Sequence, residues 1–65
     1  MYTETIGSTA RAAKVAVATV RAYADKGLVE CIRTADGRRM FQASAAQRVR
    51  EIYRERMARR GRARS

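Results

Sequence analysis

The 65-residue sequence contains no histidine, no proline and no tryptophan, and its one cysteine is Cys31. A single cysteine cannot form an intramolecular disulfide or a zinc site, so the chain suits a reducing cytoplasm and we expect neither metal nor other cofactor. Without histidine, serine and cysteine nucleophiles lack their usual general base, and no phosphate-binding G-x-x-x-x-G-K-[ST] loop is present. We therefore expect a protein that is not an enzyme.

Long apolar segments are also missing. No run approaches the roughly 20 apolar residues of a membrane span, and no signal-peptide core follows Met1, so no membrane partner is expected. Hydrophobic residues make up 46% of the chain, but 13 of them are alanine, and Leu, Ile, Val and Phe together number ten. So few large apolar side chains predict one small domain without a pocket for a small-molecule effector.

Positive charge is the strongest feature that is present. Fifteen Lys and Arg stand against six Asp and Glu, which gives a net charge of +9, and 13 of the cations are arginine. Such a balance points to a polyanionic partner, with nucleic acid as the first candidate. An anionic membrane surface is the second candidate on charge alone, and it is not the partner that we expect. Arginine favours bidentate recognition of phosphate and guanine.

The first half of the chain has the pattern of two short helices. Residues 6–14 predict a helix with Thr5 as its N-cap, and residues 17–26 predict a second helix with Gly27 just after its end. On the second helix Val17, Val20 and Ala24 share one face, and Thr19 and Lys26 lie away from it. The two or three residues between the helices are typical of a helix-turn-helix, although glycine is absent from this turn.

The second half predicts a hairpin and a long helix. A short strand around 29–32 and another at 39–41 flank the turn 34–37, where Asp-Gly can supply a positive φ. Residues 43–60 then predict a helix, and 61–65 a frayed basic tail. The apolar positions of this helix are Ala46, Val49, Ile52, Tyr53 and Met57.

These segments resemble the DNA-binding domain of MerR-type proteins. Residues 15–28 (VAVATVRAYADKGL) are similar to the family's second helix and following turn, and 33–41 (RTADGRRMF) to its wing. Ile6-Gly7 and Ala10 resemble the start of its first helix. The resemblance covers roughly residues 5 to 57. It implies a mainly α fold with a small β-hairpin wing, a winged helix-turn-helix of order helix–helix–hairpin–helix, as one domain over 5–60.

Departures from the family pattern indicate which members of the family the chain resembles. MerR-type regulators continue into a long dimerisation helix and an effector domain, whereas this chain stops, so it is more similar to the stand-alone BldC-like regulators and the small excisionases of phages and integrative elements. Ala18 and Ala22 stand where many relatives have a basic residue and a tyrosine. Thr9 replaces a usual leucine, so the first helix is expected to pack more weakly.

The resemblance assigns DNA contacts to ten residues, which are Ala18, Thr19, Arg21, Tyr23 and Lys26 on the recognition helix, Arg33, Arg38 and Arg39 on the wing, and Arg11 and Lys14 at the DNA backbone. Other roles stay open for some of them. Thr19 and Arg21 can be solvated surface, and Tyr23 is expected to be core first and phosphate contact second, with its ring under the wing. Arg39 can pair with a local carboxylate.

The composition of the C-terminal segment 43–65 is a less specific indication of function. Eight arginines against two glutamates give it +6 of the +9. They can form a general solvated face, or a flexible tail that follows a neighbouring groove of DNA.

Two functions fit the resemblance. One is a transcription regulator at the nucleoid that binds duplex DNA cooperatively at repeated sites, with head-to-tail self-association; the other is an excisionase that bends DNA and assists an integrase. A basic RNA-binding module is a third alternative. The chain has only four aromatic residues to stack on RNA bases, which argues against this alternative. The chain can also be the DNA-binding part of a longer regulator.

Overall fold

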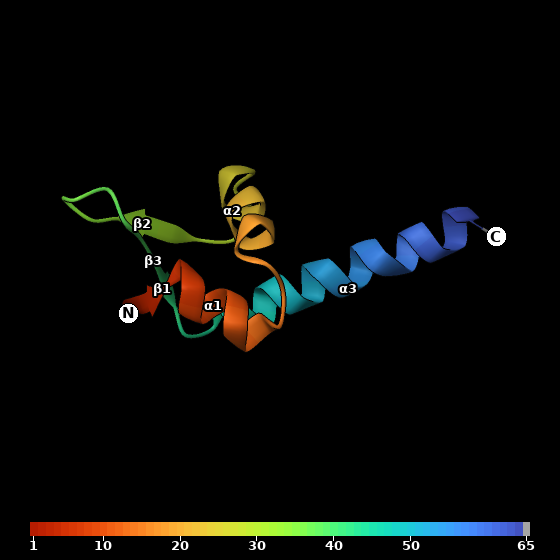
Figure 1. Ribbon diagram of the computed structural model, residues 1–65, viewed down its shortest axis with the longest axis horizontal. Helices are drawn as coiled ribbons and strands as arrows, with labels where there is room; N and C mark the ends of the chain where they lie inside the picture. The colour runs from red at the N-terminus through yellow and green to blue at the C-terminus, as the bar shows by residue number, and fades with distance from the viewer. Residues whose placement is uncertain (65) are drawn as a thin grey trace.

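The computed structural model describes the backbone of residues 1–64 and the side chains of residues 1–60, and Ser65 of the predicted tail lies outside the described residues. Six elements follow one another along the chain: β1 (Tyr2–Thr5), α1 (Ile6–Ala13), α2 (Val17–Asp25), β2 (Cys31–Arg33), β3 (Arg39–Gln42) and α3 (Ala45–Arg64) (Figure 1). Three helices with a small antiparallel sheet confirm the predicted winged helix-turn-helix.

Helix α1 has a side-chain cap at its start and a strained residue at its end. The Thr5 hydroxyl accepts a hydrogen bond from the Ser8 amide at 3.0 Å, as expected of an N-cap. Lys14 ends the helix with φ 61°, in the left-handed region, while the Val15 amide donates to the Ala10 carbonyl at 3.0 Å. This is the position where glycine is usual. The tight turn between α1 and α2 is therefore made by a lysine in a conformation that costs about 1–2 kcal/mol.

Helix α2 ends as the sequence predicts. Gly27 has φ 75°, and the Leu28 amide donates to the Tyr23 carbonyl at 2.9 Å, which closes the helix with a left-handed glycine. Val20 and Tyr23 are buried. Val17 shares one face of the helix with Val20 and Ala24, as predicted, but it lies in the first turn of α2 and 38% of its surface remains exposed.

The wing belongs to a three-stranded sheet of order β1-β3-β2. The predicted strand around 29–32 forms later, at Cys31–Arg33, and the turn between β2 and β3 has Gly37 at φ 86° as expected. Strand β1 was not predicted. It pairs antiparallel with β3, with Glu4 opposite Phe41, and so anchors the base of the wing.

The core lies where α1, α2, β3 and the first half of α3 meet. Phe41, Val20 and Val49 are fully buried at its centre. Thr9 is also buried, and its hydroxyl donates to the Thr5 carbonyl at 2.8 Å, so its polar atom is satisfied. Half of the remaining core residues are alanines, which fits the alanine-rich composition; the others are Tyr23, Val29 and Ile52.

Helix α3 extends beyond the rest of the molecule. It begins at Ala45, two residues after the predicted start, and its backbone continues through Gly61 to Arg64. Twenty residues span about 30 Å, and the molecule measures 46 × 18 × 16 Å, with the far half of α3 projecting beyond α1 and α2 (Figure 1). Beyond Ile52, Tyr53 and Met57 are 40% and 45% exposed rather than packed, because their helix has left the core.

Among the described residues, no helix has the length and apolar content needed to cross a membrane.

Candidate nucleic-acid interface

The outward face of α2 combines short and charged side chains. At 100° per residue, Ala18, Ala22 and Asp25 lie opposite the buried face, and all three are exposed. The two alanines let the helix backbone approach a base edge closely, and their methyl groups suit the methyl of thymine. The first two turns of this face are therefore small and apolar, Asp25 lies at its C-terminal end, and longer polar side chains lie on its two flanks.

One flank of α2 faces the wing across a basic hollow. Its lining residues come from α1, α2, the two wing strands and the turn between them, and they are Ile6, Arg21, Arg33, Gly37 and Arg39. Three guanidinium groups thus border one surface depression next to the outward face of α2. Such a group of donors suits the charge of a phosphate backbone.

Arg39 has structural partners within this flank. Its Nη2 forms an ion pair with Asp25, and its Nη1 donates to the Arg21 carbonyl at 3.3 Å. Its side chain is only 17% exposed. The structure therefore has the pairing with a local carboxylate, one of the two alternatives considered for Arg39, and this pairing ties β3 to the C-terminal half of α2.

The tip of the wing is more open. The Arg38 side chain is 77% exposed, and its Nε lies 3.5 Å from Asp36 Oδ2. The Thr34 hydroxyl, and next the Arg38 amide, donate to the Asp36 carboxylate and lower its pKa below the ordinary value. The carboxylate thereby orders the turn, while the Arg38 guanidinium is held only by a long, solvent-exposed contact.

The other flank of α2 faces α3. A second hollow lies here, lined by Ala18, Thr19, Ala22 and Tyr23 of α2 and by Tyr53, Arg56, Met57 and Arg60 of α3. Thr19, which the sequence places away from the packed face, is half-buried on this flank and not beside Arg21. Tyr23 is core, as expected, but its ring borders α3 and is not under the wing as predicted, and the Arg56 guanidinium lies over this ring at 5.4 Å from the centroid.

Arg56 and Arg60 were not among the predicted site residues. Helical spacing shows that they share one face of α3, but the sequence alone does not say which neighbour that face meets. The packing of α3 on the core supplies this orientation.

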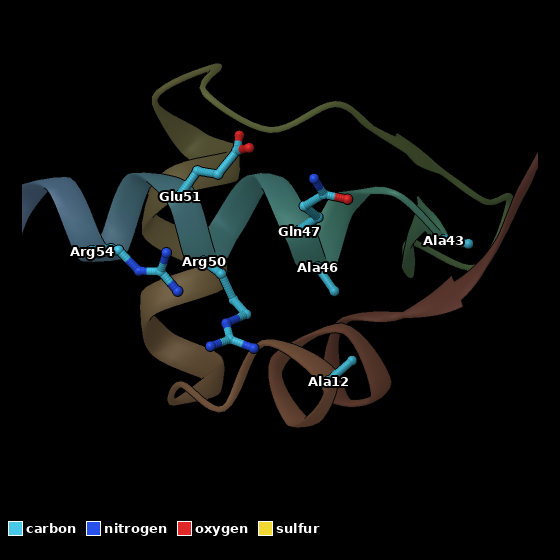
Figure 2. Close-up of a pocket in the computed structure, with 7 residues that line it drawn as sticks. All are labelled: Ala12, Ala43, Ala46, Gln47, Arg50, Glu51 and Arg54. Atoms are coloured by element: carbon cyan, nitrogen blue, oxygen red, sulfur yellow. The ribbon is translucent and has the colours of Figure 1, made fainter.

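A third basic surface lies between α1 and α3. Lys14 borders a hollow together with Arg50 and Arg54, and Figure 2 shows Arg50 extending from α3 toward α1. Lys14 is therefore beside these arginines, away from the basic hollow of the wing. Arg11 is exposed on α1, and Lys26 is exposed after the last turn of α2.

The described residues contain no group of three or more His, Cys, Asp or Glu side chains that could hold a metal ion. What the surface around α2 does offer is guanidinium donors, hydroxyl groups and methyl groups. These are the groups that recognise phosphates and base edges.

Comparison with known proteins agrees with this geometry. No curated protein matches the chain. The family model described as MerR HTH family regulatory protein matches residues 5–59, a range that contains both helices of the helix-turn-helix, the wing and most of α3. The chain therefore belongs to the MerR family of helix-turn-helix regulatory proteins, which bind DNA.

Proposed function

We propose that the protein is a small transcription regulator that recognises specific duplex sites, with α2 in the major groove and the wing at the adjacent minor groove. The observation that carries the proposal is the basic hollow between α2 and the wing, bordered by Arg21, Arg33 and Arg39. In this arrangement Arg21, exposed on α2, reads a guanine edge, while Arg33 grips a phosphate.

The remaining contacts have different chemical roles. Ala18 supplies a methyl contact, and Thr19 and Lys26 contact the backbone at the edge of the major groove. Arg38 enters the minor groove from the wing tip, since narrow grooves attract guanidinium groups. Arg11 and Lys14 add backbone contacts from α1 and its turn.

A domain of this size makes few base contacts, so useful affinity requires several copies on repeated sites. We infer that copies bind direct repeats head to tail. Contacts of this kind repeat along the DNA without closing into a ring. Each copy then strengthens the binding of the next.

The projecting half of α3 favours a second candidate function, that of an excisionase. This basic segment stands clear of the core, where it can meet an integrase or a bent duplex. Circularly permuted duplexes distinguish the two functions: strong bending together with integrase recruitment supports excision, and unbent binding beside a promoter supports regulation.

The proposed function is tested by fluorescence anisotropy with a selected duplex, a scrambled duplex and a structured RNA of equal length at fixed salt. We expect preference for the selected duplex and a slope of log K against log salt of about −4 to −6. Arg21→Ala should cost roughly 1–3 kcal/mol at one base position, read from single-base variants of the site. Preference for RNA, or a flat salt response, contradicts the proposal.

A further inference from the structure

We propose that the surface between α1 and α3 binds an acidic amphipathic helix of a partner protein. This α1–α3 surface joins the two hollows that Arg50 and Arg54 both border, and it includes Ala12 of α1 and Ala46, Arg50, Tyr53, Arg54 and Met57 of α3. Arg50 and Arg54 border neither the hollow of the wing nor the hollow beside α2. The DNA contacts proposed above for α2 and the wing therefore leave these two arginines without a role.

Four side chains of α3 form one stripe along this surface. Arg50, Tyr53, Arg54 and Met57 stand at positions i, i+3, i+4 and i+7, so they share one face of the helix. All four are exposed. Tyr53 and Met57 also border the hollow beside α2, which places them along the ridge between the two surfaces. A stripe with this spacing is what one helix presents to another helix that lies along it.

Small side chains leave room beside the stripe. Figure 2 shows Ala46 and Arg50 extending from α3 toward α1, with Ala12 on the facing helix. Both alanines line the larger hollow, which has a volume of about 500 Å³, and Ala12 is exposed. Leucine-sized side chains of a partner helix can therefore enter between α1 and α3 and cover apolar surface there.

The composition of the stripe favours a protein over a nucleic acid as the partner. Tyrosine, methionine and arginine are enriched in protein–protein interfaces, and tyrosine and arginine often supply much of the binding energy. The stripe consists of these three residue types alone. A phosphate backbone would pair with the arginines but would leave the apolar surface of Met57 without a partner.

The charges of the stripe specify an acidic partner. Among the side chains that the structure describes, no ion pair includes Arg50 or Arg54. Glu51 borders the larger hollow, but its carboxylate lies 3.9 Å from Arg48. The partner must therefore supply the carboxylates that pair with Arg50 and Arg54.

A second copy of the chain does not meet this requirement. The acidic residues of its three helices are Asp25, Glu51 and Glu55, and each is already in an ion pair with an arginine. The net charge of +9 adds repulsion between copies. The occupant is therefore a helix of another protein, with apolar residues on one face and carboxylates along its flanks.

The test uses a labelled synthetic helix of about five turns, with leucine on one face and glutamate on the flanks, which is long enough to be helical alone. Its binding to the full chain is measured by fluorescence anisotropy at fixed salt. R50Q/R54Q should weaken binding about tenfold, because two partly exposed ion pairs are lost. The matched control R56Q/R60Q removes the same charge from the face of α3 beside α2, and its affinity should stay within about twofold of the wild type.

A substitution on α1 tests the facing wall of the surface. A12E places a carboxylate against those of the peptide, so the affinity should fall at least about threefold. The matched variant A22E adds the same charge to the outward face of α2 and should leave peptide binding unchanged. Circular dichroism checks the fold of each variant. Equal losses in the two arginine pairs, or equal effects of A12E and A22E, would reveal general attraction to a basic chain and would overturn the inference.

DNA is the alternative occupant of this surface, and a duplex distinguishes it from a protein. The acidic peptide should bind the protein–duplex complex as tightly as the protein alone. Competition between duplex and peptide would assign the surface to DNA and overturn the inference, as would a loss of about 0.9 or more in the salt slope of duplex binding by R50Q/R54Q. If the wild type does not prefer duplex DNA, the proposed function fails, while peptide binding to the protein alone still tests the α1–α3 surface.

Discussion

Arg39 of β3 and Asp25 of α2 form an ion pair that joins the wing to the helix proposed to read DNA. The same guanidinium donates to the Arg21 carbonyl at 3.3 Å, so β3 holds the backbone of α2 beside an exposed arginine. These bonds reduce the hydrogen-bonding capacity that Arg39 has left for a phosphate. Of the two roles that the sequence leaves open for Arg39, the structure has the pairing with a carboxylate, and we expect this pairing to position the wing against α2.

We predict a measurable coupling between these two side chains. Asp25 is 55% exposed and Arg39 is 17% exposed, so solvent screening limits the pair to about 0.5–1 kcal/mol of folding stability. A double-mutant cycle of Arg39→Ala and Asp25→Ala, measured by urea unfolding, should give a coupling energy in this range that falls as salt rises. Additive losses would show that the pair does not stabilise the wing.

Much of the fold follows from local patterns. The Thr5 cap, the glycines after α2 and in the wing turn, and the alternation of short strands and turns are all readable because each depends on residues close in sequence. Strand β1 is not readable in this way. Its residues pair with residues of β3 that lie 35 to 40 positions later in the chain, and nothing within YTET requires a strand.

The sequence predicts what kind of site this is, a DNA-binding surface, but not which residues of the site contact one another. A basic helix-turn-helix with a basic wing predicts DNA binding, yet the partner of Arg39 and the face of α3 that meets α2 both depend on tertiary packing. Val17 and Met57 show the same limit. Both fit an apolar helical stripe, yet 38% of Val17 and 45% of Met57 remain exposed.

Lys14→Gly should stabilise the protein. Lys14 has φ 61°, and glycine adopts this region without the steric cost of a Cβ. The substitution removes the steric cost but gives the unfolded chain the greater freedom of glycine. The net gain in the free energy of unfolding is about 0.5–1 kcal/mol. Thermal unfolding should show a rise in Tm of several degrees. Lys14→Ala is the matched control, because it removes the same charge but keeps the strained Cβ. An equal gain in both variants would assign the effect to charge.

The carboxylate of Asp36 should titrate below the ordinary range of aspartate. The hydrogen bond from the Thr34 hydroxyl, followed by that from the Arg38 amide, favours its charged form. Because the folded pKa is lowered, the carboxylate stabilises the turn above the unfolded pKa, and this contribution is lost as the pH falls through the folded pKa. NMR titration of the side-chain carboxyl carbon measures the shift. Thr34→Ala should raise the pKa, Thr34→Ser should preserve it, and an unchanged value in Thr34→Ala would refute the assigned cause.

The free protein should be a monomer that assembles only on DNA. The exposed apolar residues of projecting α3 are Tyr53 and Met57, set among Arg54, Arg56, Arg59 and Arg60 with Glu55 as the acidic neighbour. Pairing two such helices would bring like charges together over a small apolar area, whereas a stable dimer needs a large one. On DNA the phosphates neutralise these charges, so neighbouring copies can approach. Light scattering of the free protein, followed by footprints on one, two and four direct repeats, measures both states. A dimer in the absence of DNA would contradict the charge argument, and independent filling of each repeat would contradict cooperative assembly.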